Sequence, residues 1–180
     1  MRMMLYLSLA LLLPVSGTAQ TGADTVSPSI ATLSAGVVCG PPVVGTSPAP
    51  DTIAGSTHIV AEDPPFIAEI RQVPAVLGIG FGVKAQASDP GGLSGVTMTV
   101  THPPMGDTGV TQQSYVTWIS GDGPSMTFYQ FDEEFERVTG TWTFTAQYLG
   151  EDLYTVSFDV VPPGALPQLA AACGYLDLLS

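Results

Sequence analysis

The sequence predicts an all-β protein, a sandwich of antiparallel sheets with about seven to nine short strands and little helix. Three observations lead to this expectation. Apolar and polar residues alternate with a period of two over several segments. Turn-forming residues separate these segments roughly every 8 to 12 positions. The alternating segments are rich in Thr, Val, Tyr and Phe, which half-buried strands favour.

The N-terminus, residues 1–19, has the order of an export signal peptide. The charged residue Arg2 precedes an apolar run, residues 5–13, and the small residues Gly17 and Ala19 stand at the −3 and −1 positions of a cleavage site. The run is about half of the ~20 residues that a membrane-spanning helix needs. We therefore expect cleavage, no membrane span afterwards, and a periplasmic or extracellular protein.

Three further parts are expected after the signal. Residues 20–56 form an N-terminal strand and a Pro- and Gly-rich lead-in, residues 57–163 form the sandwich, and residues 164–180 form a C-terminal tail. Within the lead-in, residues 30–38 have a weak strand pattern, and residues 40–56 are expected to be a loop or an extended segment.

Alternation is clear in residues 81–88 and 96–101, which flank a turn signal at residues 89–92. Together they predict a β-hairpin with one buried face. Weaker strand patterns precede this hairpin at residues 58–61 and 67–72.

The middle of the chain predicts two further strands, residues 115–120 and 126–131, around a turn at residues 121–124. The first of these is apolar on both faces, which is typical of a central strand. Few segments favour helix: residues 165–172 are one candidate, and residues 132–136 are expected to form a single turn.

A second hairpin gives the strongest structural signal. Residues 141–148 and 154–160 both alternate, and Gly150, Glu151 and Asp152 form the turn between them. The Pro pair that follows ends the second strand, because proline cannot donate a hydrogen bond to the sheet.

Cys39 and Cys173 are the only cysteines of the chain. An even pair in an exported protein predicts a disulfide, and neither residue stands in the Cys-x-x-Cys pattern of a redox pair. We expect this disulfide to tie the C-terminal tail back to the domain.

Residues 140–144, Gly-Thr-Trp-Thr-Phe, are followed by Tyr-Leu-Gly-Glu at 148–151 and Phe-Asp-Val at 158–160. This pattern resembles the terminal hairpin of immunoglobulin-like domains in exported bacterial proteins. The whole chain is also similar to an alphaproteobacterial family of exported proteins of unknown function, over roughly residues 57–161. The resemblance implies an immunoglobulin-like sandwich and brings no catalytic or binding residues with it.

Charge excludes one class of partner. The chain has 4 Lys and Arg against 16 Asp and Glu, a formal net charge of −12. Nucleic acid is not expected as a partner, because phosphate binding needs clustered basic residues. Such a charge favours solubility, with cationic proteins or divalent cations as alternative partners.

Catalytic motifs are absent from the sequence, and we expect neither an enzyme nor a cofactor. There is no Gly-x-Ser-x-Gly elbow, and the two histidines, His58 and His102, are distant in the chain. His102 precedes two prolines and is expected to be a solvated residue at a strand end. The glycines of residues 78–82 lack the dinucleotide-binding pattern, so strand flexibility or close packing is their better explanation.

Acidic side chains are densest at Asp132, Glu133, Glu134 and Glu136. Carboxylates are suited to calcium and serve in pairs in glycoside hydrolysis. The four residues are therefore weak candidates for a divalent-cation site, a contact with a basic partner, or a hydrolytic site. A solvated acidic turn is the expectation that we favour, and we predict no metal site.

Trp118 and Trp142 are the two tryptophans, and an exposed tryptophan is a platform for sugar stacking. Trp142 alternates in phase with Phe144 and Tyr148, which predicts a position in the core. We also expect Trp118 to be buried in its central strand.

These patterns favour a non-catalytic binding or interaction module of the cell envelope, whose partner is an envelope or extracellular protein. A carbohydrate-recognition module, a hydrolase using residues 132–136, and a purely structural envelope component are the alternatives. On such folds, binding uses loops or a free sheet edge. The candidate loops are residues 104–111, the turn at Gly121 and the acidic turn.

Overall fold

The computed structural model describes residues 24–176; the expected export signal lies outside this part. The strands are β1 (Thr25–Val26), β2 (Ile30–Cys39), β3 (Val43–Pro48), β4 (Ser56–Val60), β5 (Gln72–Pro74), β6 (Ile79–Ala87), β7 (Leu93–Met105), β8 (Val110–Ile119), β9 (Ser125–Gln130), β10 (Gly140–Tyr148) and β11 (Glu151–Val161). The helical segments are η1 (Glu134–Glu136), η2 (Pro163–Ala165) and α1 (Pro167–Ala172).

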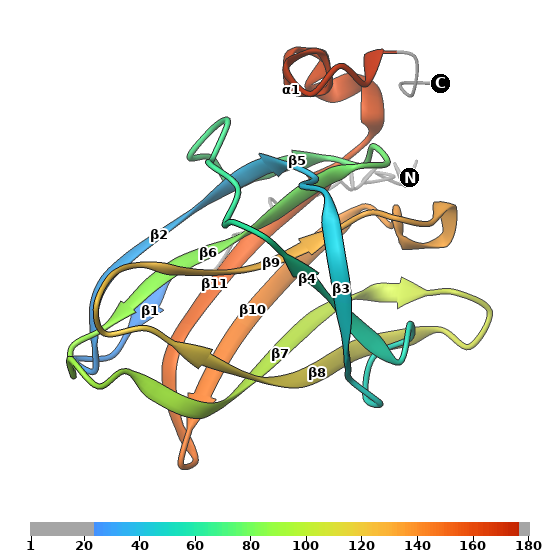
Figure 1. Ribbon diagram of the computed structural model, residues 1–180. Coiled ribbons are helices and arrows are strands. Elements are labelled where there is room, and N and C mark those ends of the chain that lie inside the picture. Colours follow the sequence, from blue (N-terminus) through green and yellow to red (C-terminus); the bar gives the residue numbers. More distant parts are fainter. Residues whose placement is uncertain (1–23, 177–180) are drawn as a thin grey trace, which may run out of the picture.

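Two sheets form the body of the molecule (Figure 1). The larger sheet has the order β1-β11-β10-β7-β8, with β5 added in parallel to β11. The smaller sheet has the order β2-β6-β9, and β3 pairs only with β4 in a separate hairpin. The expected all-β sandwich with little helix is therefore confirmed.

The second predicted hairpin is confirmed as β10 and β11, although Glu151 and Asp152, which were expected in the turn, belong to β11. Trp142 lies opposite Phe158 and Phe144 lies opposite Val156, so the buried sides of both strands face the smaller sheet. The chain reverses at Leu149 and Gly150, both of which have positive φ. Such a tight reversal suits the right-handed twist of the two strands.

The first predicted hairpin is wrong. Residues 81–88 fall in β6 of the smaller sheet, whereas residues 96–101 fall in β7 of the larger sheet. The turn at residues 89–92 exists, since Gly92 donates to the carbonyl of Asp89, but it carries the chain from one sheet to the other. Alternation reports which face of a strand is buried, and both strands bury a face in the same core without pairing.

Three segments differ in detail from the sequence expectations. The lead-in at residues 40–56 contains all of β3, and residues 67–72 contribute only their last residue to a strand, β5. The expected loop at residues 104–111 is shorter, because β7 continues to Met105 and β8 begins at Val110.

The core is centred on Phe81, whose ring lies between the two sheets. Its centroid is 5.5 Å from that of Trp142, 5.8 Å from Phe144 and 5.1 Å from Phe158. Each edge-to-face pair of this kind contributes roughly 0.5–1.5 kcal/mol beyond the burial of its area. The predicted core position of Trp142 is confirmed, since its side chain is fully buried.

Close packing explains the glycines of β6, as the sequence predicted. A Cβ atom on Gly82 would collide with the carbonyl oxygen of Thr127 and lie 2.5 Å from the Cα of Phe128. A Cβ atom on Gly80 would lie 2.9 Å from a methyl group of Val38. Only glycine lets β6 approach its neighbours this closely.

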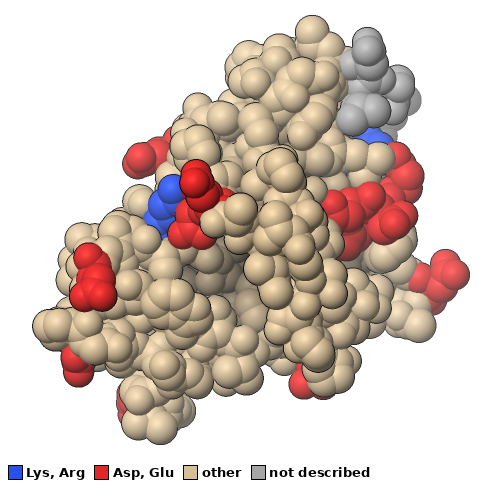
Figure 2. Space-filling model, viewed as in Figure 1, with Lys and Arg blue, Asp and Glu red and all other residues tan. Residues whose placement is uncertain are grey.

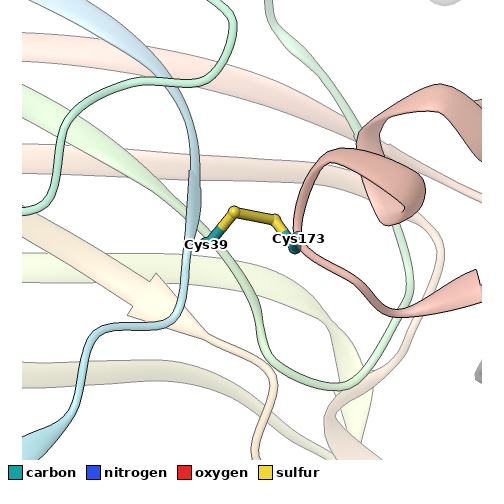
Figure 3. The surroundings of a disulfide bond; sticks show 2 residues. All are labelled: Cys39 and Cys173. Carbon is teal, nitrogen blue, oxygen red and sulfur yellow. A yellow bond between two sulfur atoms is a disulfide. The ribbon is translucent and has the colours of Figure 1, made fainter.

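The C-terminal tail is held by the predicted disulfide (Figure 3). Cys39 ends β2 and Cys173 follows α1, with their Cα atoms 5.4 Å apart and 134 positions between them in sequence. Leu169 and Ala170 of α1 are buried against the sandwich. Among the helical segments of residues 24–176, none has the length and hydrophobicity of a membrane-spanning helix.

Candidate functional site

A groove opens where the two sheets end on the same side of the sandwich, between β8 and β9. The β3–β4 hairpin, residues 43–60, crosses this opening, and we call it the strap (Figure 1). The space between the strap, β8 and β9 has a volume of about 410 Å³. Figure 2 shows the surface hollowed beside the strap.

A second hollow of about 470 Å³ continues the first. Both are lined by Thr117, Trp118 and Met126, so the two hollows adjoin, and we call them together the groove. Asp63 and the turn at residues 121–124 line the far end. Residues of the strap line one end of the groove, and residues of the turn that links β8 to β9 line the other.

The tip of the strap is fastened to β8 by two hydrogen bonds. The backbone N–H of Ser114 donates to the carbonyl oxygen of Asp51 at 3.1 Å. The backbone N–H of Ile53 donates to Oε1 of Gln113 at 2.9 Å. At its root the strap follows Cys39, which the disulfide fixes, so both ends of the strap are anchored.

His102 supports this anchor from inside the sandwich. Its Nε2 accepts from the side-chain amide of Gln113 at 3.2 Å, and its Nδ1 donates to the carbonyl oxygen of Pro103 at 2.9 Å. Its ring packs 4.7 Å from that of Trp142, and burial lowers the pKa of the imidazole. The expectation of a solvated His102 is wrong: its side chain is buried and neutral, and its role is structural.

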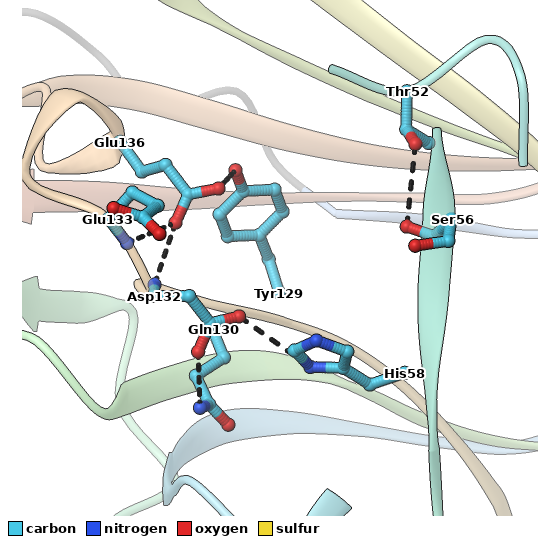
Figure 4. Close-up of polar contacts among 8 residues, drawn as sticks. All are labelled: Thr52, Ser56, His58, Tyr129, Gln130, Asp132, Glu133 and Glu136. Atoms are coloured by element: carbon cyan, nitrogen blue, oxygen red, sulfur yellow. Dashed lines mark hydrogen bonds and ion pairs between the residues drawn. The ribbon is translucent and has the colours of Figure 1, made fainter. Parts of the chain in front are cut away.

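Two tyrosines, Tyr115 of β8 and Tyr129 of β9, lie on the floor of the groove. Burial raises the pKa of Tyr115, and burial together with the negative charge of Glu136 raises that of Tyr129. Both phenols therefore stay protonated at neutral pH. The Tyr129 hydroxyl donates to Oε1 of Glu136 at 2.7 Å (Figure 4).

Glu136 is a structural residue of the acidic turn. Its Oε2 accepts the backbone N–H groups of Asp132 at 2.7 Å and Glu133 at 2.9 Å, while its Oε1 accepts from Tyr129 (Figure 4). Hydrogen bonds of this kind hold the start of η1. These three hydrogen bonds tie the Glu136 carboxylate to the backbone of the turn and to β9.

The other members of the cluster point in different directions. Glu134 forms a bidentate ion pair with Arg137, at 2.9 and 2.7 Å. Asp132 accepts from Gln130 at 2.7 Å and lies 3.5 Å from Nδ1 of His58 on the strap (Figure 4). Opposed free carboxylates, which glycoside hydrolysis requires, are not formed by this turn. Among the residues that the structure describes, no group of three or more His, Cys, Asp or Glu is placed to hold a metal ion.

Trp118 occupies a different position from the one that the sequence predicts. Its strand β8 is an edge strand, and the side chains of Trp118 and Val116 are 59% and 73% exposed on the outer face. The neighbouring β7 places threonines on that face, opposite Val116 and beside it. The apolar pattern of β8 is therefore that of an exposed patch beside the groove.

Several sequence candidates thus meet in one place. The groove brings together His58, Trp118, Asp132 and the turn after β8, whereas the turn between β7 and β8 does not line it. Asp63 and Gln113 were not singled out from the sequence. Their signal was weak, because an acidic residue in a loop and a glutamine within a strand are common.

The charged side chains that line the groove are acidic. The charged residues that line the groove are Asp63, Asp122, Asp132 and Glu136, and the described lining contains no Lys or Arg. Around these carboxylates lie hydroxyl groups of the strap, β8 and β9. Such a lining favours neutral or cationic ligands.

Known proteins that resemble this chain bear on its fold. The family described as "Domain of unknown function (DUF3859)" matches residues 27–160. The crystal structure of an immunoglobulin-like protein from Pseudomonas aeruginosa is 21% identical, with a TM-score of 0.51, and the match covers 80% of this chain and 100% of that one. No curated protein matches the chain. At this identity the likeness concerns the fold alone, and it shows that the sandwich is immunoglobulin-like, as expected.

Proposed function

The chain belongs to the DUF3859 family, and we propose that its immunoglobulin-like sandwich is a non-catalytic binding module whose ligand lies in the groove between β8 and β9. The observation that carries this proposal is the strap. A hairpin anchored at both ends crosses a hollow of about 410 Å³ and leaves it open on the sides. Ligand sites are commonly concave, preformed and lined by a few polar groups among apolar ones.

The contacts of the acidic residues support binding over catalysis. Glu136 and Glu134 are engaged in local hydrogen bonds and an ion pair, and His102 is locked between Gln113 and Pro103. No nucleophile, base and orienting acid come together among these described residues in the manner of a catalytic triad.

Thr117 offers a direct test, because it lines both hollows and its side chain points into the groove. The chain without the expected signal, residues 20–180, would be titrated with panels of soluble peptides and oligosaccharides while amide chemical shifts are recorded. We expect a ligand whose shift changes cluster on the strap, β8 and β9, and whose binding Thr117→Trp weakens at least tenfold.

Thr141→Trp is the matched control, because it adds the same side chain to an exposed position of β10, opposite Asp159 and away from the residues that line the groove. Both variants must keep the native amide spectrum. Ligands that map elsewhere, or that bind both variants equally, would contradict the groove as the site.

Carbohydrate recognition is a second candidate function, favoured by one observation. Trp118 presents an exposed ring at the mouth of a groove rich in hydroxyl groups. Aromatic rings of this kind stack on the apolar faces of sugars. In the panel above, binding of an oligosaccharide but of no peptide would favour carbohydrate recognition, and binding of a peptide alone would count against it.

We also propose that the protein is exported and works in the cell envelope or outside the cell. The disulfide supports this location, because such bonds persist in oxidising compartments. Fractionation of the native host and N-terminal sequencing of the mature chain test it. We expect a chain that begins at Gln20, outside the cytoplasm, and a cytoplasmic chain with intact residues 1–19 would contradict the proposal.

A further inference from the structure

Exposed sheet edges are ready templates for another strand, and native proteins usually cover them. In this sandwich the outer edge of β11 is covered by the short strands β1 and β5. The free edge of β2 is covered by residues 67–71: Val37 exchanges hydrogen bonds with Ala68 and Ile67, and Arg71 donates to the carbonyl of Ala35. Two of the four sheet edges, those of β11 and β2, are therefore covered by other segments of the protein.

The edge of β9 carries a different form of protection. The carboxylate of Asp63 accepts the outward-facing N–H of Met126 at 2.9 Å. A charged side chain placed on a sheet edge prevents another strand from pairing there. The start of β9 is thus blocked at the point where it faces β8 across the groove.

The edge of β8 is left open in its middle. The N–H of Ser114 is bonded to Asp51, and the N–H of Ser120 is bonded to Oγ of Ser125. Because successive residues alternate in direction, the backbone groups of Val116 and Trp118 face the same free side. Among the described residues, none forms a hydrogen bond with them on that side. The open stretch, residues 115–119, would span about 17 Å as a strand.

The sequence of β8 also lacks the usual protection. Its ten residues contain no charge and no proline, and its exposed side chains include Val116 and Trp118. A partner strand on this edge would place every second side chain against these two residues. The alternate side chains would point into the groove, where the charged residues that line it are all acidic.

We propose that the free edge of β8 binds an extended, basic segment of a partner protein as an added strand, with apolar side chains on Val116 and Trp118 and basic side chains in the groove near Asp63 and Asp122. This inference rests on the proposed function of the groove and names its ligand. Main-chain hydrogen bonds supply affinity in such strand addition, and alternate side chains supply specificity. The net charge of −12 disfavours a second copy of the same chain as the occupant.

Three synthetic peptides test the proposal on the full exported chain. The first is an acetylated and amidated Thr-Lys-Val-Lys-Val-Lys-Thr. The second has the same sequence with both valines N-methylated, which removes the N–H groups that would face β8. The third has Glu in place of each Lys. We expect the first peptide to slow hydrogen exchange of the Val116 and Trp118 amides at least tenfold at saturation.

The other two peptides separate the contributions of backbone and charge. We expect the N-methylated peptide to give no such protection and the Glu peptide to bind at least tenfold more weakly. Affinity of the first peptide should also fall several-fold when the salt concentration is raised. Equal binding of the N-methylated peptide would overturn strand addition, and equal binding of the Glu peptide would overturn the basic partner.

Val116→Lys adds a charge to the open edge and should weaken the first peptide at least tenfold. Leu149→Lys is the matched control, because Leu149 is 86% exposed at the β10–β11 turn, away from the groove residues. Unchanged binding by Val116→Lys would overturn the proposal. A concentration-dependent dimer that Val116→Lys abolishes would also overturn it, since the occupant would then be a second copy.

The result is separable from the test of the groove itself. An oligosaccharide or other ligand that maps to the groove, combined with no peptide protection at β8, would overturn this inference and leave the groove function standing. If Thr117→Trp weakened the binding of no ligand, both the groove function and the strand addition at β8 would be overturned.

Discussion

Gln113 connects the strap to His102 through the two ends of one side-chain amide. Its Oε1 accepts the N–H of Ile53 at 2.9 Å, and its nitrogen lies 3.2 Å from Nε2 of His102. Gln113 is buried, so both hydrogen bonds are formed away from water, where an unsatisfied group is costly. The position of the strap over the groove therefore depends on a residue beneath it.

Replacing Gln113 with Ala should release the strap tip. The change leaves the N–H of Ile53 and Nε2 of His102 without their partner, and we expect a loss of about 1–3 kcal/mol in the free energy of unfolding. Hydrogen exchange at Ile53 should also accelerate. Gln112→Ala is the matched control on the exposed face of β8. Similar stability of the two variants would contradict the role of the buried amide.

Stability should depend on pH through His102. Burial lowers its pKa from the usual 6.5, although the hydrogen bond to Pro103 and the charge of Glu136 oppose this effect. Near pH 6.5 and below, the unfolded chain takes up a proton that the folded chain does not. The contribution of His102 to the free energy of unfolding is therefore complete above about pH 6.5. It decreases as the pH falls below this value, by at most about 1.4 kcal/mol per pH unit.

Urea unfolding between about pH 7.5 and pH 5.5 measures this dependence. His102→Gln should flatten the profile, because glutamine does not titrate. A wild-type protein whose stability is constant across this range, or rises on acidification, would contradict the lowered pKa.

Within the acidic turn, we expect the loss of the Glu136 carboxylate to lower stability and the loss of the Glu133 charge to have little effect. Glu136→Ala removes the carboxylate that accepts from two backbone N–H groups and from the Tyr129 hydroxyl. We expect a loss of roughly 1–3 kcal/mol. Glu133→Gln changes an exposed side chain and should stay within about 0.5 kcal/mol of wild type. Urea unfolding distinguishes them, and equal effects would contradict the structural role of Glu136.

The disulfide should contribute strongly to stability. It closes a loop of 134 positions, and in the chain-entropy account a loop of this length restricts the unfolded state by about 5 kcal/mol. The double variant Cys39→Ser with Cys173→Ser should therefore unfold at much lower urea concentration than the oxidised protein. Reduction of the wild-type protein should give the same shift, and an unchanged midpoint in both cases would contradict this account.

Sequence patterns predicted which segments are strands better than they predicted which strands pair. The β10–β11 hairpin was predictable because its turn is two residues long and both strands bury one face. Residues 81–88 and 96–101 show the same alternation around a similar turn, yet they belong to different sheets. Alternation contains no information about the neighbour of a strand, and a short turn can also link two packed sheets.

The site was less predictable than the fold. His58, Trp118 and Asp132 were all considered from the sequence, but only the crossing of the strap brings them to one groove. The apolar character of β8 favoured a buried central strand, whereas the structure places it at an edge. The same residues suit either position, since an exposed apolar strand and a buried one have similar sequences.

The two tryptophans should therefore behave differently in solution. Trp118 is 59% exposed, whereas Trp142 is fully buried and its indole N–H donates to the carbonyl of Val138 at 3.0 Å. We expect iodide to quench only part of the fluorescence. Trp118→Phe should remove the accessible part with little change in stability, and Trp142→Phe should cost about 1–3 kcal/mol, because it leaves a cavity and an unpaired carbonyl.

The same variants test the carbohydrate alternative. An oligosaccharide that stacks on Trp118 should protect its fluorescence from iodide, and Trp118→Ala should weaken that binding at least tenfold, since most of the contact area is lost. Trp118→Phe keeps an aromatic ring and should retain part of the affinity. If every oligosaccharide that binds the groove binds Trp118→Ala as tightly as wild type, the exposed ring is not a sugar platform. The exposed Trp118 ring would then be explained by the proposed binding of a partner strand at the edge of β8.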